Sequence, residues 1–126
     1  MNIGEIYFTN VPFTGKEKLI MIMGEDVTSS TFGFCIINSE INEKAIPPKA
    51  LDYHLPLTQE ACPCLNHDSN IDCSQLYEGS TPILASTVRN RTSRLIGAAP
   101  ATLVETLRNT VRASPLLVLH RGRRFL

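Results

Sequence analysis

The chain has 126 residues, of which 43% are hydrophobic and 19% are charged, a balance typical of a folded domain rather than a disordered chain. Its longest apolar runs, at 19–23 and 116–119, are far shorter than the ~20 residues that a membrane-spanning helix needs. No basic region followed by an apolar one opens the sequence. We therefore expect one domain over residues 1–126, with no signal peptide, no membrane association and a cytoplasmic location.

The formal net charge of zero conceals two oppositely charged parts. Residues 1–85 carry four lysines against eleven acidic residues, whereas residues 86–126 carry eight arginines against one glutamate. Arginine presents a planar group that suits phosphate and stacks on bases, so the second part is suited to nucleic acid or an acidic partner. Equally, this basic end can pack on the acidic body or on a second subunit, and charge alone does not decide between the two.

Apolar runs rich in β-branched and aromatic residues, separated by turn residues, predict a series of strands along the chain. The run from Lys18 to Met23 is continuously apolar after its first residue, as expected of a strand buried on both faces. Pro47 and Pro48 exclude regular structure around them. The predicted strands are 3–9, 18–23, 32–38, a short edge strand around 55–57, 71–77, 83–88 and 95–97, with a further candidate at 116–119.

One helix is predicted near the C-terminal end, over residues 100–113. Pro100 suits its first turn and Pro115 stops it. Four apolar residues recur on one helical face, namely Leu103, Val104, Leu107 and Val111. The basic tail that follows, 119–126, is expected to be mobile. This order of elements predicts a mainly β fold, a small barrel-like domain with one C-terminal α-helix.

Several segments resemble the PemK/MazF toxin family. The stretch Gly4 to Phe13, with its glycine–acid pair leading into an apolar strand, resembles the opening strand of that family. The run 18–23 lies where the family has its second strand, and 76–97 with the helix 100–111 is similar to its closing strands and helix. The resemblance implies an SH3-like barrel that forms a homodimer, cleaves single-stranded RNA without a metal or other cofactor, and is held inactive by an antitoxin protein.

The resemblance also implies two catalytic positions. In the family, an arginine before the second strand stabilises the scissile phosphate, and a threonine or serine after the third strand assists it. Lys18 and Ser39 stand at these positions. Because lysine supplies a point charge where arginine makes a bidentate contact, a second hypothesis remains open. In it, the chain is a non-catalytic binding module on the same barrel, either a protein inhibitor or a nucleic-acid-binding subunit.

Further site candidates come from residue chemistry alone. His67 is a candidate acid or base near neutral pH, oriented by Asp68 or Asp72, although His67-Asp68-Ser69 also suits a turn that caps its own backbone. On a strand, Arg89 and Arg91 would share one face and form a row for phosphates. The catalytic candidates are therefore Lys18, Ser39, His67 and Asp68, and the nucleic-acid-binding candidates are Lys16, Arg89, Arg91 and Arg94. Lys16 and Lys18 also fit two solvated loop lysines.

Three of the four cysteines and a histidine fall within a short window, Cys62, Cys64, His67 and Cys73. These are zinc-type ligands, but a C-x-C spacing differs from the C-x₂-C pattern of zinc knuckles. The competing interpretation is a set of small buried residues with free thiols, and Cys35, within an apolar strand, fits that description. No metal is therefore assigned from the sequence.

Overall fold

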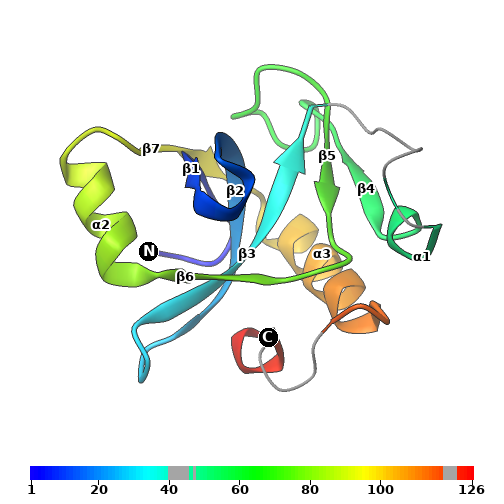
Figure 1. Ribbon diagram of the computed structural model, residues 1–126. Coiled ribbons are helices and arrows are strands. Elements are labelled where there is room, and N and C mark those ends of the chain that lie inside the picture. The colour runs from blue at the N-terminus through cyan, green and yellow to red at the C-terminus, as the bar shows by residue number, and fades with distance from the viewer. Residues whose placement is uncertain (40–45, 47, 118–121) are drawn as a thin grey trace.

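The computed structural model describes residues 1–39, 46, 48–117 and 122–126, and it shows one antiparallel seven-stranded sheet with helices beside it (Figure 1). The strands run in the order β4-β5-β3-β2-β1-β7, with β6 paired to β3. They are β1 (Glu5–Val11), β2 (Lys16–Asp26), β3 (Thr31–Asn38), β4 (His54–Leu57), β5 (Ser69–Asp72), β6 (Tyr77–Ser80) and β7 (Arg94–Ala98). The predicted mainly β fold is confirmed, with β4 and β7 as the ends of an open sheet.

The central strand β2 separates two apolar cores. Met21 and Met23 face one core, and Ile20 and Ile22 face the other, because successive side chains of a strand point to opposite faces. The expectation of a strand buried on both faces is therefore confirmed. The helix α3 (Ala101–Ala113) packs on the first core and α2 (Thr81–Arg89) on the second, so the two helices cover opposite faces of the sheet (Figure 1).

The expected strand over 83–88 is wrong, because this segment lies in the helix α2. Ser80 caps the helix by accepting a hydrogen bond from the Ile83 amide, and a proline occupies the first turn. Leu84 is the buried residue that anchors it. The local start signals thus outweigh the β-branched character of Ile83 and Val88. The expected strand over 71–77 is in fact the end of β5 and the start of β6.

The expectation that the two prolines exclude regular structure is wrong at Pro48, which begins the one-turn helix α1 (Pro48–Leu51), since the first turn of a helix tolerates proline. Pro47 lies outside the described residues. The predicted C-terminal helix is confirmed as α3, with Pro100 at its cap and Ser114 at its end. Of the candidate strand 116–119, residues 116 and 117 form a turn and bend, and the remainder lies outside the described residues.

The last five residues pack on the sheet, where the sequence predicts a mobile tail. Arg123–Phe125 form a short 3-10 helix, and Phe125 is only 4% exposed. A Cβ at Gly24 would lie 1.5 Å from the Phe125 carbonyl oxygen, and one at Gly33 would lie 2.8 Å from the Phe125 ring. Two glycines on neighbouring strands therefore make room for this segment. Residues 119–121 of the predicted tail lie outside the described residues.

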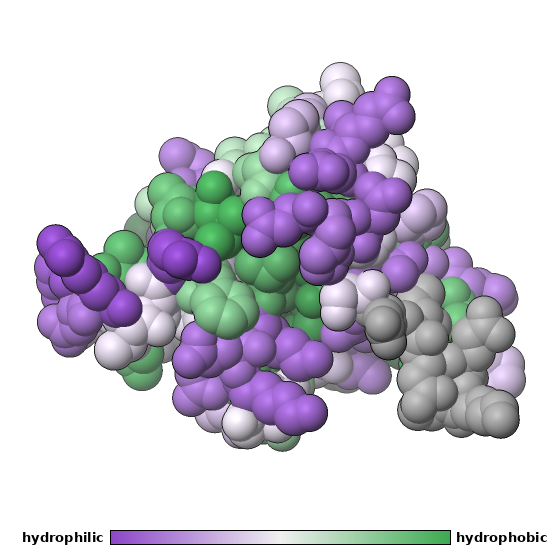
Figure 2. Space-filling view, turned by 90° about the horizontal axis from the view of Figure 1, so that it is seen from above, coloured by the Kyte–Doolittle hydropathy of each residue, from purple (hydrophilic) through white to green (hydrophobic). Residues whose placement is uncertain are grey.

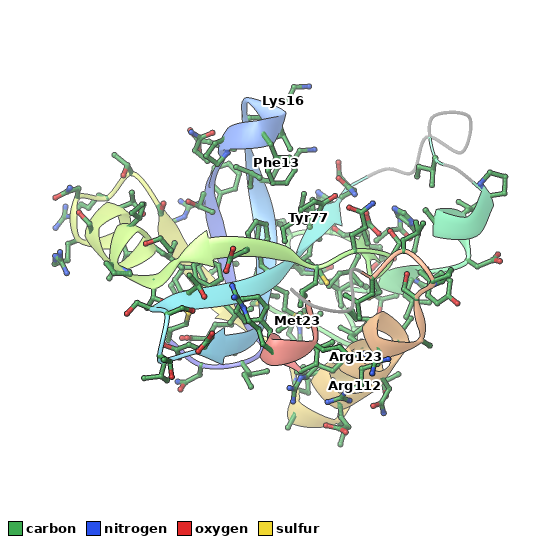
Figure 3. All side chains as sticks on the ribbon, turned by 60° about the horizontal axis from the view of Figure 1, so that its bottom comes forward. Phe13, Lys16, Met23, Tyr77, Arg112 and Arg123 are labelled. Atoms are coloured by element: carbon green, nitrogen blue, oxygen red, sulfur yellow. The ribbon has the colours of Figure 1, made fainter. Side chains whose placement is uncertain are left out.

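Part of the arginine-rich segment is used within the fold. Arg124 forms ion pairs with Asp26, at 3.7 Å, and with Glu78. Arg108 and Arg112 donate to a main-chain oxygen of Leu126 at 2.9 and 2.7 Å. Arg112 lies on the α3 side, away from the β1–β2 hairpin tip that carries Lys16 (Figure 3). Self-neutralisation thus accounts for some of the arginines. Within the described residues, no helix is long and apolar enough to cross a bilayer.

Candidate active site

A continuous groove opens at one end of the sheet. It consists of three adjoining cavities of about 320, 310 and 220 Å³ that share Phe8. Its apolar floor is made by Phe8, Leu19 and Ile96, and polar side chains from the ends of β3 and β7 and from the loop before β5 form its walls. Seen from above, apolar surface gathers in the middle of the molecule between hydrophilic flanks (Figure 2).

Strand register places an arginine over the floor of the groove. Phe8 pairs with Leu19 of β2 on one side and with Arg94 of β7 on the other, so the three side chains share one face. The Arg94 guanidinium carbon lies 5.9 Å from the centroid of the Phe8 ring, within the range of a cation–π interaction. Arg94 is otherwise exposed, which leaves its charge accessible to a ligand.

The opposite wall is the loop between β4 and β5, which carries His67. Buried Leu65 anchors this loop, and the Leu65 amide donates to the Cys62 carbonyl at 3.1 Å. The carboxylate of Asp68 accepts a hydrogen bond from the Gln59 amide at 2.8 Å. Asp68 therefore braces the loop, as in the turn interpretation of this segment, and its carboxylate engages the backbone.

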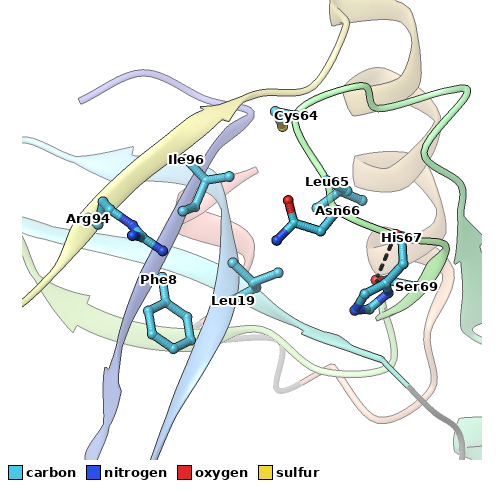
Figure 4. Close-up of a pocket in the computed structure, with 9 residues that line it drawn as sticks. All are labelled: Phe8, Leu19, Cys64, Leu65, Asn66, His67, Ser69, Arg94 and Ile96. Carbon is cyan, nitrogen blue, oxygen red and sulfur yellow. Dashed lines mark hydrogen bonds between the residues drawn. The ribbon is translucent and has the colours of Figure 1, made fainter.

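The hydrogen bonds of His67 orient its ring. Its Nδ1 lies 2.9 Å from the Asp68 carbonyl oxygen and 3.4 Å from the Ser69 hydroxyl. Because a carbonyl oxygen can only accept, Nδ1 is the donor, and the tautomer that makes this bond leaves the electron pair of Nε2 for a ligand. Figure 4 shows His67 and Arg94 on opposite sides of the groove, with the Asn66 amide between them. Such a pair offers a base and a cation to one ligand.

Ser39 and Lys18 occupy different places relative to the groove. Ser39, just after β3, lines the middle cavity together with His67. Lys18 lines this cavity as well, and its Nζ lies 3.5 Å from Oδ1 of Asn38, another lining residue. Lys18 pairs with Thr9, and Leu19 pairs with Phe8, so strand alternation directs Lys18 to the face opposite the groove floor. The groove thus gathers Ser39, His67 and Arg94, while Lys18 contributes to the lining of the middle cavity.

The other basic candidates are scattered. Lys16 lies at the tip of the β1–β2 hairpin, as Figure 3 shows. Arg89 is exposed in the last turn of α2, and Arg91 follows in a left-handed turn with φ of 62°. The expected strand face shared by Arg89 and Arg91 is therefore wrong, since a helix ends between them. Arg91 nonetheless lines the groove beside Arg94.

Several groove residues were not picked out by sequence reasoning. Phe8 and Glu17 line two or more of the cavities, and Asn66 and Ser69 line the wall beside His67. Ser69 is 4% exposed, and its hydroxyl lies 3.4 Å from His67 Nδ1. The adjacency of His67, Asp68 and Ser69 in the sequence does not by itself predict this contact. Phe8 and Glu17 lie on the same face of the neighbouring strands β1 and β2. Strand alternation predicts this only when the pairing register of the two strands is known.

The structure does not assemble the four zinc-type ligands. The Sγ atoms of Cys62 and Cys64 lie 3.6 Å apart, whereas Cys73 packs beside Cys35. Among the described residues, no three His, Cys, Asp or Glu side chains come close enough together to hold a metal ion. Burial, with Cys64 as neighbour, raises the pKa of Cys62 to about 12. The interpretation as free thiols fits this arrangement.

The sequence matches no known family profile. It also matches no curated protein. The fold is similar to chains in two crystal structures of MazE–MazF from Deinococcus radiodurans. The Form-II chain is 13% identical, with 88% of this chain and 90% of that chain covered and a TM-score of 0.56. The Form-III chain is 9% identical, with 88% and 92% covered and a TM-score of 0.57. At such identities the likeness concerns the fold alone, and it confirms the MazF-like fold that the resemblance implied.

Proposed function

We propose that this chain is a toxin-like endoribonuclease that cleaves single-stranded RNA in the groove without a metal or other cofactor. The observation that carries the proposal is the placement of His67 and Arg94 on facing walls above an apolar floor, on a MazF-like fold. A base and a cation on two sides of a phosphodiester are what RNA cleavage through the 2′-hydroxyl requires.

The chemistry follows from the positions of these groups. The free Nε2 of His67 takes the proton of a ribose 2′-hydroxyl, and the 2′-oxygen attacks the adjacent phosphorus. A new P–O2′ bond forms, the P–O5′ bond breaks, and the departing 5′-oxygen takes a proton from water. Arg94 stabilises the negative charge that builds on the phosphoryl oxygens. Ser39 donates to the same phosphate, and the Phe8 ring is placed to stack on a base.

Two protein partners belong to the proposal. Because the similar structures are MazE–MazF complexes, an antitoxin that blocks the groove is the expected inhibitor. A homodimer is expected as well, since the resemblance implies one and the acidic and basic parts of the sequence can pair across a two-fold axis. Sedimentation at micromolar concentration tests it, and a monomer under all conditions would count against the dimer.

A non-catalytic binding module is the second candidate. One observation favours it: Lys18, which stands at the position of the family's catalytic arginine, lies on the strand face opposite the groove floor, and its Nζ lies 3.5 Å from Asn38 Oδ1. A module of this kind would bind RNA or a protein on the same surface without cutting. The two candidates differ in whether the bound RNA is broken.

The deciding experiment incubates the purified protein with a long single-stranded RNA in the presence of a chelator. The proposal predicts discrete cuts, and it predicts that a 2′-deoxy substitution at the cut nucleotide abolishes them because the nucleophile is gone. Tight binding of RNA or of a protein with no cutting would favour the binding module. Cutting that requires added metal would contradict the proposed chemistry.

A further inference from the structure

Two thiols meet in the groove wall that carries His67. Cys64 is partly exposed and lines the cavity that holds Arg94 and His67, whereas Cys62 is fully buried. Their Sγ atoms lie 3.6 Å apart. The proposed reaction uses neither of them. A buried thiol in contact with a solvent-facing one is the arrangement of a resolving and a reactive cysteine.

Cys64 also forms the contact between the two walls of the groove. A Cβ on Gly97 of β7 would lie 2.6 Å from Cys64 Cβ and 3.0 Å from its Sγ. The loop therefore rests directly on the β7 backbone, at a position where only glycine leaves room. On the β7 side of this contact, Arg94 and Ile96 line the groove, and on the loop side, Asn66 and His67 line it. A movement of Cys64 changes how the walls sit against each other.

We propose that Cys62 and Cys64 form a redox-sensitive pair, which peroxide converts to a disulfide that displaces His67 and slows the reaction. The regulatory part rests on the proposed function. In the first step the Cys64 sulfur attacks one peroxide oxygen, the O–O bond breaks, and a sulfenic acid and water form. In the second, the Cys62 thiol attacks that sulfur, and water leaves. Two thiols and one peroxide thus give one disulfide and two waters.

The disulfide requires a local movement. An S–S bond is about 2.05 Å long, so the two sulfurs must approach by roughly 1.5 Å from their present distance. Cys62 is fully buried in the first core, and so Cys64 is the one that shifts, away from Gly97. His67 lies three residues further along the same loop. A displacement of about 1 Å at a catalytic group can cost about 10²-fold in rate.

The remaining cysteines provide an internal control. Cys35 and Cys73 are both fully buried in the core and lie beside each other. The pKa of Cys62 is raised to about 12, chiefly by its burial, which keeps it a thiol until its partner is oxidised. Exposure to solvent therefore selects Cys64 as the first target and leaves Cys35 and Cys73 reduced.

The test treats the reduced, folded protein with hydrogen peroxide, removes the peroxide, unfolds the protein in urea with N-ethylmaleimide to block every free thiol, and maps the peptides. The expected result is a Cys62–Cys64 disulfide, with Cys35 and Cys73 alkylated, and a shift of the His67 ring resonances in NMR spectra. RNA cleavage should fall about 10²-fold and return with dithiothreitol. In Cys64→Ser, peroxide should leave both the His67 resonances and the ratio of treated to untreated cleavage unchanged.

Each other outcome has a defined meaning. Free thiols at both positions after peroxide, or irreversible oxidation of Cys64 without a disulfide, would overturn the proposal. A disulfide that leaves the His67 resonances unmoved would overturn the switch. If the reduced protein cuts no RNA, yet the disulfide forms and moves His67, the proposed function fails and the redox pair stands. Should Cys64→Ser not fold, the peptide map and spectra of the wild-type protein still decide.

Discussion

The guanidinium carbon of Arg94 lies 5.9 Å from the centroid of the Phe8 ring, because the two residues face each other across β7 and β1. The contact fixes a positive charge beside an apolar surface, and His67 faces both from the opposite wall. In a nucleotide whose phosphate binds Arg94, the base can therefore stack on the Phe8 ring, and the ribose can face the His67 imidazole. This relationship is the basis of the predictions about activity.

Arg94→Ala should lower the rate of RNA cleavage by about 10²–10³, because it removes a preorganised charge at the developing negative phosphate. Arg89→Ala is the matched control, since it removes the same charge from an exposed position at the end of α2 outside the groove. Single-turnover rates with a labelled RNA measure both. Equal losses of cleavage rate in the two variants would show that the effect comes from the net positive charge of the protein and not from a contact of Arg94 with the phosphate.

Lys18→Ala should lower the rate by no more than about tenfold, because a half-exposed charge on the strand face opposite the groove floor contributes ~1 kcal/mol or less. The resemblance to the toxin family instead implies that this change nearly abolishes cleavage. Single-turnover rates separate the two expectations. A loss equal to that of Arg94→Ala would contradict the minor role of Lys18.

His67→Gln should reduce cleavage by about 10²–10⁴, because glutamine cannot take a proton from the 2′-hydroxyl. Asp68→Asn is its control. The asparagine keeps an oxygen that accepts the bond from the Gln59 amide, so the loop and the rate should change little. Rates at one pH, with circular dichroism of each variant, make the comparison. A fully active His67→Gln would remove the base from the mechanism.

Phe125→Ala should lower the free energy of unfolding by about 3–5 kcal/mol, as expected when a buried phenylalanine is truncated. Phe13→Ala makes the same chemical change at a side chain that is 60% exposed, and should cost much less. Urea denaturation followed by circular dichroism measures both. Equal stability of Phe125→Ala and the wild type would mean that residues 122–126 do not pack on Gly24 and Gly33 in solution.

Alkaline pH should destabilise the protein through Tyr77. Burial, followed by the nearby Asp72 and Cys35, raises the pKa of the Tyr77 hydroxyl above its usual value. The unfolded chain then ionises first. This stabilising contribution is fully present below the unfolded pKa of about 10 and is lost as the pH rises through the folded value. Urea titrations across this range should show a shallower loss for Tyr77→Phe than for the wild type. An unchanged slope would contradict the assignment.

Strands and the last helix could be predicted from sequence because their signals are local. Continuous apolar runs indicated β2 and β3, and a 3.6-residue period with flanking prolines indicated α3. In the segment 83–88 the β-branched residues favour a strand, whereas Ser80 and Pro82 before it favour the start of a helix, and the helix forms. The packing of Phe125 on two glycines depends on contacts about a hundred residues apart, which no local pattern contains.

The site was only partly predictable for a similar reason. His67, Ser39 and Arg94 were named from residue chemistry or resemblance, and the groove gathers them. Phe8 and Glu17 carry no motif, and their role depends on the pairing of β1 with β2 and β7. The resemblance implies a catalytic role for Lys18, but the direction of its side chain depends on strand parity, and a one-residue change of register would reverse it.

The most direct test of the groove as the RNA site is an NMR titration with an uncleavable 2′-deoxy analogue of the sequence that the protein cuts. Isotope-labelled protein reports each amide and side chain as the oligonucleotide binds. Our account predicts the largest shifts at Phe8, His67, Ser69 and Arg94, which line one groove. Shifts confined to the hairpin tip around Phe13 and Lys16, with His67 and Arg94 unmoved, would contradict it.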